Sequence, residues 1–158
     1  MTPVLLFILL FYAPPVVRSP ECVCIRNPDR SEEIVKAERR QAFDQSTAVF
    51  AGKVVALDTY KVTFELEKRW KGDSPRGEVV LSTGAVTGYD GTAWPGECSY
   101  HFDLGQTYLV FAYGAGEKME ANRCSTLPIN KAAEEEKGLD QIKPHENIPR
   151  ANKSTLRQ

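Results

Sequence analysis

The sequence lacks an excess of charge of either sign. Its 158 residues include 20 Lys and Arg against 21 Asp and Glu, so the formal net charge at neutral pH is −1. A protein that neutralises nucleic-acid phosphates needs clustered Lys and Arg in excess, so this balance argues against a nucleic-acid-binding surface. The length suits one domain and is too short for two of ordinary size.

The chain also lacks the short motifs that mark catalytic sites. It contains no GxSxG, no HExxH and no phosphate-binding glycine loop. Of its two histidines, His145 lies near the polar C-terminal end, and His101 lies close to Cys98, where a packed or surface role is the simpler interpretation. His101 with Asp103 supplies two metal ligands, too few for a site. We therefore expect a protein that is not an enzyme and that needs no cofactor and no intrinsic metal ion.

An uninterrupted apolar run lies at the N-terminus, over residues 4–13, and two prolines follow it. A helix needs about 20 apolar residues to cross a bilayer, so the run predicts the apolar core of a signal peptide within residues 1–19. No Lys or Arg precedes the run, and no clear cleavage site follows it, so an uncleaved membrane anchor is the alternative. The leader predicts a secreted or cell-envelope protein.

Four cysteines, Cys22, Cys24, Cys98 and Cys124, form an even set in a chain expected to leave the cytosol. An oxidising compartment favours two disulfides. Cys22 and Cys24 are poor partners for each other, because one intervening residue in an extended backbone points both side chains the same way. Each should therefore bond to Cys98 or Cys124, and the spacing leaves both pairings open. Zinc binding and redox chemistry are the alternatives, but Cys98 and Cys124 are isolated rather than paired at metal-ligand spacing.

The middle of the chain carries the patterns of short strands. Apolar and polar residues alternate from Tyr60 to Trp70, which predicts a strand with one solvated face. A bulge or bend is expected at Gly52. Further strands are predicted over residues 48–57, 78–83, 108–113 and 118–124. Five short strands without a βαβ rhythm predict a mainly β fold, a small closed antiparallel barrel within residues 20–139.

Helices are predicted on either side of these strands. A sequence that resembles a capping box opens a charged helix over residues 29–43, and a shorter helix is predicted over residues 131–137. Residues 140–158 are polar and predict a disordered tail. The tail contains a glycosylation sequon at Asn152.

One connection, residues 84–96, is longer than most loops, rich in Gly and Pro, and carries Tyr89 and Trp94. Such a loop is either a binding element or a segment pinned to the domain, and the adjacent Cys98 favours pinning. Exposed aromatic residues on a rigid loop are good anchors for a protein partner. The alternative is that Tyr89 and Trp94 cover one end of the barrel.

Several motifs follow one another in order: the Cys-x-Cys pair at Cys22 and Cys24, segments 48–54, 62–72 and 102–112, and Cys124 with Ser125. The ordered set resembles the netrin-like domain family over about residues 22–139. It is most similar to the exported bacterial proteins that resemble tissue inhibitors of metalloproteinases. The resemblance implies a five-stranded OB-type antiparallel barrel with an N-terminal and a short C-terminal helix. It also implies the disulfides Cys22–Cys98 and Cys24–Cys124.

In the animal inhibitors of this family, the first cysteine is the mature N-terminus and chelates the zinc of the protease. The resemblance implies that Cys22 has this role and that Val23 enters the specificity pocket, flanked by Cys24 and Ile25. Chelation requires a free amine on Cys22, and Glu21 precedes it, so the cleavage position of the leader decides whether the role is open.

Two functions are therefore expected for an exported protein-binding domain. One is inhibition of an extracellular metalloendopeptidase through the edge formed by residues 22–25. The alternative is a non-inhibitory interaction module of the cell envelope or matrix, which binds a protein partner through residues 84–96. Contact with a membrane is expected only if the leader stays uncleaved.

Overall fold

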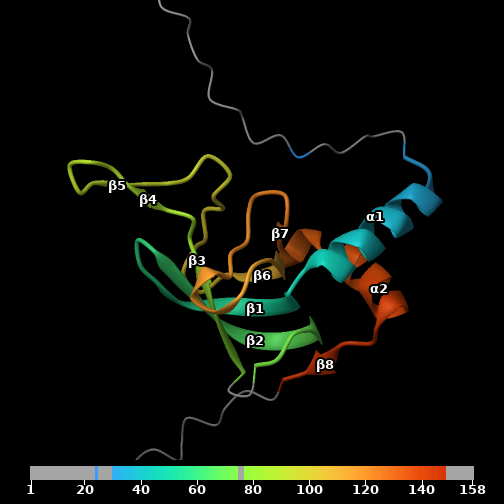
Figure 1. Ribbon diagram of the computed structural model, residues 1–158. Coiled ribbons are helices and arrows are strands. Elements are labelled where there is room, and N and C mark those ends of the chain that lie inside the picture. The colour runs from blue at the N-terminus through green and yellow to red at the C-terminus, as the bar shows by residue number, and fades with distance from the viewer. Residues whose placement is uncertain (1–23, 25–29, 75–76, 149–158) are drawn as a thin grey trace, which may run out of the picture.

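The computed structural model describes residues 24, 30–74 and 77–148 of the chain. Within them the fold is mainly β, with antiparallel sheets and two α-helices (Figure 1). None of the described helices is both long enough and apolar enough to cross a membrane. The elements are, in chain order, α1 (Glu32–Gln45), β1 (Ala48–Leu57), β2 (Lys61–Lys71), β3 (Glu78–Ser82), β4 (Val86–Thr87), β5 (Ala93–Trp94), β6 (Thr107–Ala112), η1 (Gly116–Lys118), β7 (Thr126–Pro128), η2 (Ile129–Lys131), α2 (Ala133–Ile142) and β8 (Glu146–Asn147).

The main sheet is open and has the strand order β3-β2-β1-β6-β7, with β8 paired to β2. The expected closed barrel is therefore wrong. Closure needs a continuous strand over residues 118–124, but the chain turns at Gly114 and forms η1 there. Only single bridges remain: the amide of Ser82 donates to the Met119 carbonyl at 2.7 Å, and Glu120 pairs with Tyr113.

β2 does not keep all its apolar side chains on one face, as its alternation predicts. Gly52 of β1 pairs with Leu66, and the neighbouring Ala51 pairs with Lys68. Glu67, between them, is therefore an extra residue on β2. This register step lies at Gly52 of β1, where a bulge or bend is predicted, and it moves the following residues to the other face. Leu66 and Trp70 consequently belong to different apolar clusters. The predicted solvated face is wrong for the second half of β2, because α2 covers it.

The sheet thus separates two apolar clusters. The inner cluster lies on one face and includes edge-to-face ring pairs, such as Phe64 with Phe102 at 5.2 Å between centroids. The helix cluster joins the other face to Phe43 of α1 and Leu139 of α2. β6 contributes to both clusters, which explains why it is apolar on both faces, as the sequence predicts. Figure 1 shows both helices on one side of the molecule, away from the β4–β5 hairpin.

Residues 140–148 belong to the predicted disordered tail, but they contain the end of α2 and the strand β8. α2 continues through Gly138, whose missing Cβ leaves room for the guanidinium of Arg39 on α1. β8 then pairs with β2, and the amide of Ile148 donates to the Glu67 carbonyl at 3.0 Å. Local composition does not predict tertiary contacts of this kind. The sequon at Asn152 lies outside the described residues.

Candidate binding surface

The structure contains the disulfide Cys24–Cys124, with Cα atoms 5.2 Å apart, across a sequence separation of 100 residues. This is one of the two pairings that the family resemblance implies. A disulfide indicates an oxidising compartment. No cysteine among the described residues is free. Cys22, Val23 and Ile25 lie outside the described residues, so the edge that they form and the pairing of Cys22 with Cys98 stay predictions.

A tight turn places Cys124 beside Cys98. The side-chain oxygen of Asn122 accepts hydrogen bonds from the amides of Cys124, at 2.9 Å, and Ser125, at 3.1 Å. The amide of Arg123 in the same turn donates to the Cys98 carbonyl at 3.0 Å. Cys24 is therefore tied, through Cys124, to the point where the chain leaves residues 84–96.

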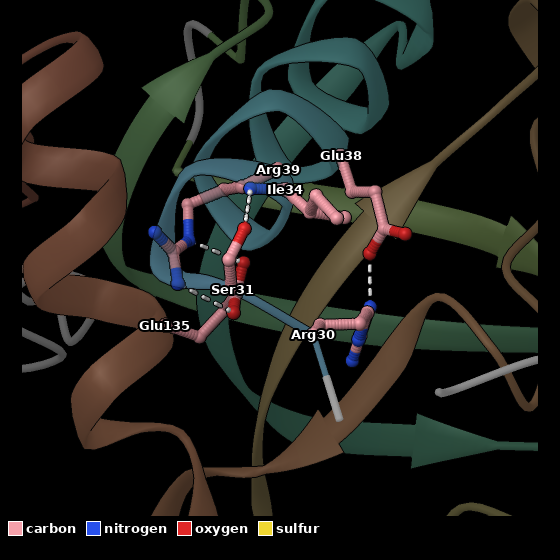
Figure 2. A network of polar contacts seen from close by, with 6 residues as sticks. All are labelled: Arg30, Ser31, Ile34, Glu38, Arg39 and Glu135. Carbon is pink, nitrogen blue, oxygen red and sulfur yellow. Dashed lines mark hydrogen bonds and ion pairs between the residues drawn. The ribbon is translucent and has the colours of Figure 1, made fainter. Parts of the chain in front are cut away.

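Polar contacts fix the start of α1 and join this helix to α2 (Figure 2). Ser31 caps the helix by accepting a hydrogen bond from the amide of Ile34 at 3.4 Å. Arg30 forms an ion pair with Glu38, and Figure 2 shows this pair apart from the contacts of Arg39. The Arg39 guanidinium binds both carboxylate oxygens of Glu135 on α2, at 2.8 and 3.2 Å. The Arg39–Glu135 contact holds α1 to α2, whereas the contacts of Ser31 and Arg30 fix the start of α1.

Residues 84–96 form a short hairpin rather than an irregular loop. Val86 pairs with Trp94, and the carboxylate of Asp90 accepts a hydrogen bond from the amide of Thr92 at 3.0 Å. Hydrogen bonds from Thr92 hold the pKa of Asp90 below its usual value. Tyr89 at the tip is fully exposed and Trp94 is 56% exposed. Tyr89 therefore does not cover the end of the sheet.

The hairpin is pinned to the rest of the molecule at its base and along one side. The amide of Gly96 donates to the Gly84 carbonyl at 3.2 Å. The hydroxyls of Tyr60 and Thr87 lie 3.0 Å apart, which joins the β1–β2 turn to the hairpin. That turn is closed by Asp58, whose carboxylate accepts hydrogen bonds from two backbone amides that lower its pKa.

A cleft of about 230 Å³ lies under the hairpin and has a mostly apolar lining. One wall comes from the β1–β2 turn, and another from Tyr100 and Phe102, whose rings lie 4.9 Å apart. Phe102 also packs in the inner cluster, so this wall is anchored in the core. Burial raises the pKa of the Tyr100 hydroxyl, with a smaller contribution from Asp103.

The exposed apolar residues of the hairpin and of the β1–β2 turn, together with the cleft, form what we call the hairpin surface. Its apolar side chains are Leu57, Tyr60, Val86, Tyr89 and Trp94. Sequence reasoning singled out Tyr89 and Trp94 but missed Leu57 and Tyr60, because it assigned both only to predicted strands. No sequence signal shows that the β1–β2 turn meets the hairpin. His101 also lines the cleft, and the described residues contain no group of three or more metal-binding side chains.

The second histidine lies on the helix side of the molecule. The Nδ1 of His145 lies 2.7 Å from the Asp140 carboxylate, which also accepts a hydrogen bond from the Trp70 indole at 2.8 Å. Burial disfavours the charged form of Asp140, but the hydrogen bonds from His145 and Trp70 outweigh it and hold its pKa below the usual value. His145 is thus part of an anchor that attaches the C-terminal segment to α2.

Neither a protein-family model nor a curated protein matches the chain. Membership of the netrin-like family therefore stays a prediction that rests on the motifs between Cys22 and Ser125.

Proposed function

We propose that this chain is an exported protein-binding module, and that it binds its partner through the hairpin surface. The observation that carries the proposal is the exposure of Tyr89 and Trp94 on a hairpin pinned above an apolar cleft. Large aromatic side chains near an apolar pocket are typical binding hot spots. Clustered exposure of such residues is unusual on a surface that binds nothing.

The attachment of the hairpin supports the same function. Two-residue strands are far too short to be stable alone, so their geometry depends on the contacts at Gly84, Gly96 and Tyr60. A surface that is already ordered loses less conformational entropy on binding. The hairpin surface therefore combines apolar anchors with a fixed arrangement.

Export is supported by two features of different kinds. The Cys24–Cys124 disulfide is stable in an oxidising compartment and rare in the cytosol. The apolar run of residues 4–13 has the composition of a signal peptide. Together they favour a partner in the cell envelope or outside the cell.

A second candidate function is inhibition of a metalloendopeptidase through Cys22, Val23, Cys24 and Ile25. The observation that favours it is the Cys24–Cys124 disulfide, which holds Cys24 beside Cys98 at the base of the hairpin. A protease bound at the Cys-x-Cys edge would then also contact the hairpin. On this version the hairpin surface contributes affinity and Cys22 supplies the zinc ligand.

Site-specific photo-crosslinking tests the binding module. A photo-reactive aromatic residue in place of Tyr89 should give a discrete adduct with one protein in the medium or envelope of cells that produce the chain. The same residue in place of Ile34, an exposed apolar position on α1, is the matched control and should give none. Adding Trp94→Ala should reduce the adduct at position 89. Equal adduct patterns at positions 89 and 34 would contradict the proposal.

The inhibitor version has its own test. N-terminal sequencing of the exported chain should begin at Cys22, and the purified chain should inhibit at least one enzyme of a metalloproteinase panel. Any residue ahead of Cys22, or full protease activity at saturating protein, excludes this version. Neither result would affect the adduct expected at position 89.

A further inference from the structure

Most of the hairpin surface, apart from Leu57 and Tyr60, lies in a part of the chain that has no Lys or Arg. Between Arg76 and Lys118 the sequence contains no Lys or Arg, although the chain has 20 of them. This stretch forms the whole hairpin and the wall of the cleft that carries Tyr100. Basic residues are therefore distributed very unevenly along the chain, although the net charge of the whole chain is only −1.

Four carboxylates border the hairpin surface, and we call them the acidic rim: Asp58, Asp90, Glu97 and Asp103. Asp58 lines the cleft, and Glu97 is an exposed residue between two segments that line it. Asp90 and Trp94 both approach Gly88. The Oδ1 of Asp90 and the Nε1 of Trp94 each lie about 3 Å from the position that a Cβ on Gly88 would occupy. Asp103 follows Phe102 of the cleft wall, and its charge contributes to the raised pKa of the Tyr100 hydroxyl.

The acidic rim has no ion-pair partners in the part of the chain that the structure describes. None of its four carboxylates forms an ion pair with another described residue. Hydrogen bonds from backbone amides lower the pKa of Asp58, and the charge of Lys61 contributes to a smaller extent, so this carboxylate stays ionised at neutral pH. The basic residues nearest in the chain are Lys61, which follows the β1–β2 turn, and His101 in the cleft wall.

The size of the cleft limits what it can hold. Its volume of about 230 Å³ is below the range of roughly 300–1,000 Å³ that is typical of pockets for drug-sized ligands. Its lining includes Leu57, Ala93 and Pro95, which offer an apolar contact and little hydrogen bonding. A single apolar side chain of a partner fits these properties better than a polar metabolite does.

We infer that the partner presents a basic segment, in which an aliphatic side chain fills the cleft and flanking Lys or Arg side chains face the acidic rim. This inference rests on the proposed function and adds the chemistry of the partner. The exposed rings of Tyr89 and Trp94 can also bind cations through their faces. Opposite charges across the contact increase the association rate and disfavour acidic competitors.

The same charge pattern argues against two other occupants. Two copies of the chain that met through their hairpin surfaces would place one acidic rim against the other, which is repulsive. A membrane surface rich in anionic lipid would be repelled in the same way. A basic protein segment is the occupant that the acidic rim and the apolar cleft accommodate together.

Fluorescence anisotropy of labelled peptides with the full chain tests the inference. The probe is a peptide with one Leu flanked on each side by two Lys or Arg residues. In one control peptide Glu replaces every basic residue, and in the other Gly replaces the Leu. The basic Leu peptide should bind most tightly, and raising the salt concentration from about 0.05 M to about 0.5 M should weaken its binding, because the rim carboxylates are exposed.

Two matched pairs of variants identify the surface. Asp58→Asn with Glu97→Gln removes two rim charges, and the amide that replaces the Asp58 carboxylate keeps the oxygen that closes the β1–β2 turn. This variant should bind the basic peptide about 3- to 10-fold more weakly. Glu33→Gln with Glu134→Gln removes two exposed helix charges and should change binding by less than about 2-fold. Trp94→Ala should weaken binding by at least about 10-fold, and Ile34→Ala should not.

The outcomes distinguish this inference from the function on which it rests. Tighter or equal binding of either control peptide, or an unaffected rim variant, overturns the inference. No binding of any peptide also overturns it. If the adduct at position 89 still forms in that case, the protein-binding function stands and only the chemistry of the partner is wrong.

Discussion

Trp70 and Trp94, the two tryptophans of this chain, lie in opposite surroundings. Trp70 is completely buried in the helix cluster, and its indole N–H donates to Asp140. Trp94 is more than half exposed on the hairpin, beside an apolar cleft. The indole of Trp70 is enclosed and hydrogen-bonded inside the molecule, whereas most of the indole of Trp94 is exposed on the surface. This difference agrees with our proposal that the helix side maintains the fold and the hairpin end binds a partner.

The charges of the two regions differ in the same sense. On the helix side, basic and acidic groups are paired across elements, as in Arg39 with Glu135 and Lys68 with Glu136. At the hairpin end, the acidic rim carries carboxylates without basic partners among the described residues. Paired charges contribute to the cohesion of a fold, whereas unpaired charges of one sign favour a partner of opposite charge.

The largest effect on stability is expected from Trp70→Ala. Removing a fully buried indole leaves a cavity in the helix cluster and should lower the free energy of unfolding by about 4 kcal/mol. Trp94→Ala is the matched control and should change it by less than about 0.5 kcal/mol. Urea unfolding followed by far-UV circular dichroism measures both. Similar losses for the two variants would contradict the division of the molecule into a stability region and a binding region.

The Cys24–Cys124 disulfide should have the next largest effect. It closes a loop across 100 residues, so replacing both cysteines with Ser should lower the free energy of unfolding by about 3 kcal/mol. Thermal unfolding with and without a reductant measures the change, and the reductant control shows whether the remaining cysteines contribute. Unchanged stability of the double variant would mean that this disulfide constrains the unfolded chain very little.

The ion pair between Arg39 and Glu135 should matter more than an exposed pair of the same kind. Their side chains are 11% and 26% exposed, and Glu135→Gln removes the anion while Arg39 stays largely buried. We expect a loss of about 1.5 kcal/mol in the free energy of unfolding. The control is Glu32→Gln, which breaks the exposed pair with Lys36 and should cost much less. Equal costs would show that the contact between α1 and α2 does not depend on this pair.

The smallest effect is expected for the charge of Asp140 and depends on pH. Its pKa is lower in the folded chain than in the unfolded chain, so the charge stabilises the fold above about pH 4. This contribution is lost as the pH falls through the folded-state pKa. Asp140→Asn keeps an acceptor for the Trp70 indole, so between about pH 5 and pH 3 the variant should lose less stability than the wild type does. Parallel losses would show that the carboxylate charge has no part in holding the C-terminal segment.

Much of the secondary structure could be predicted because its causes are local. The segment from Ala48 to Leu57 and the alternation through Val62 and Phe64 predict two strands, and the structure contains both. Gly52 predicted an irregularity at this point, but that the extra residue is Glu67 on β2 could not be predicted, because it depends on the register between the two strands. Barrel closure was wrongly expected for the same reason. Whether residues 118–124 pair as a strand is decided by their neighbours across the sheet.

The candidate site could be predicted only in part. Tyr89 and Trp94 were recognisable because they are aromatic residues in a Gly- and Pro-rich segment. Leu57 and Tyr60 were not, because their place beside the hairpin comes from the packing of two connections that are distant in sequence. The Cys-x-Cys edge stays a prediction, apart from the bond that Cys24 forms with Cys124.

By itself, the sequence determined the periodicity of the strands, the even set of cysteines and the absence of basic residues between Arg76 and Lys118. These properties depend only on the order of residues along the chain. The tertiary structure alone decided that Trp70 is enclosed by α2, that Trp94 lies beside a cleft, and that Asp58 lines the same cleft. Such placements require segments far apart in the chain to pack together, and that packing is set by the fold as a whole.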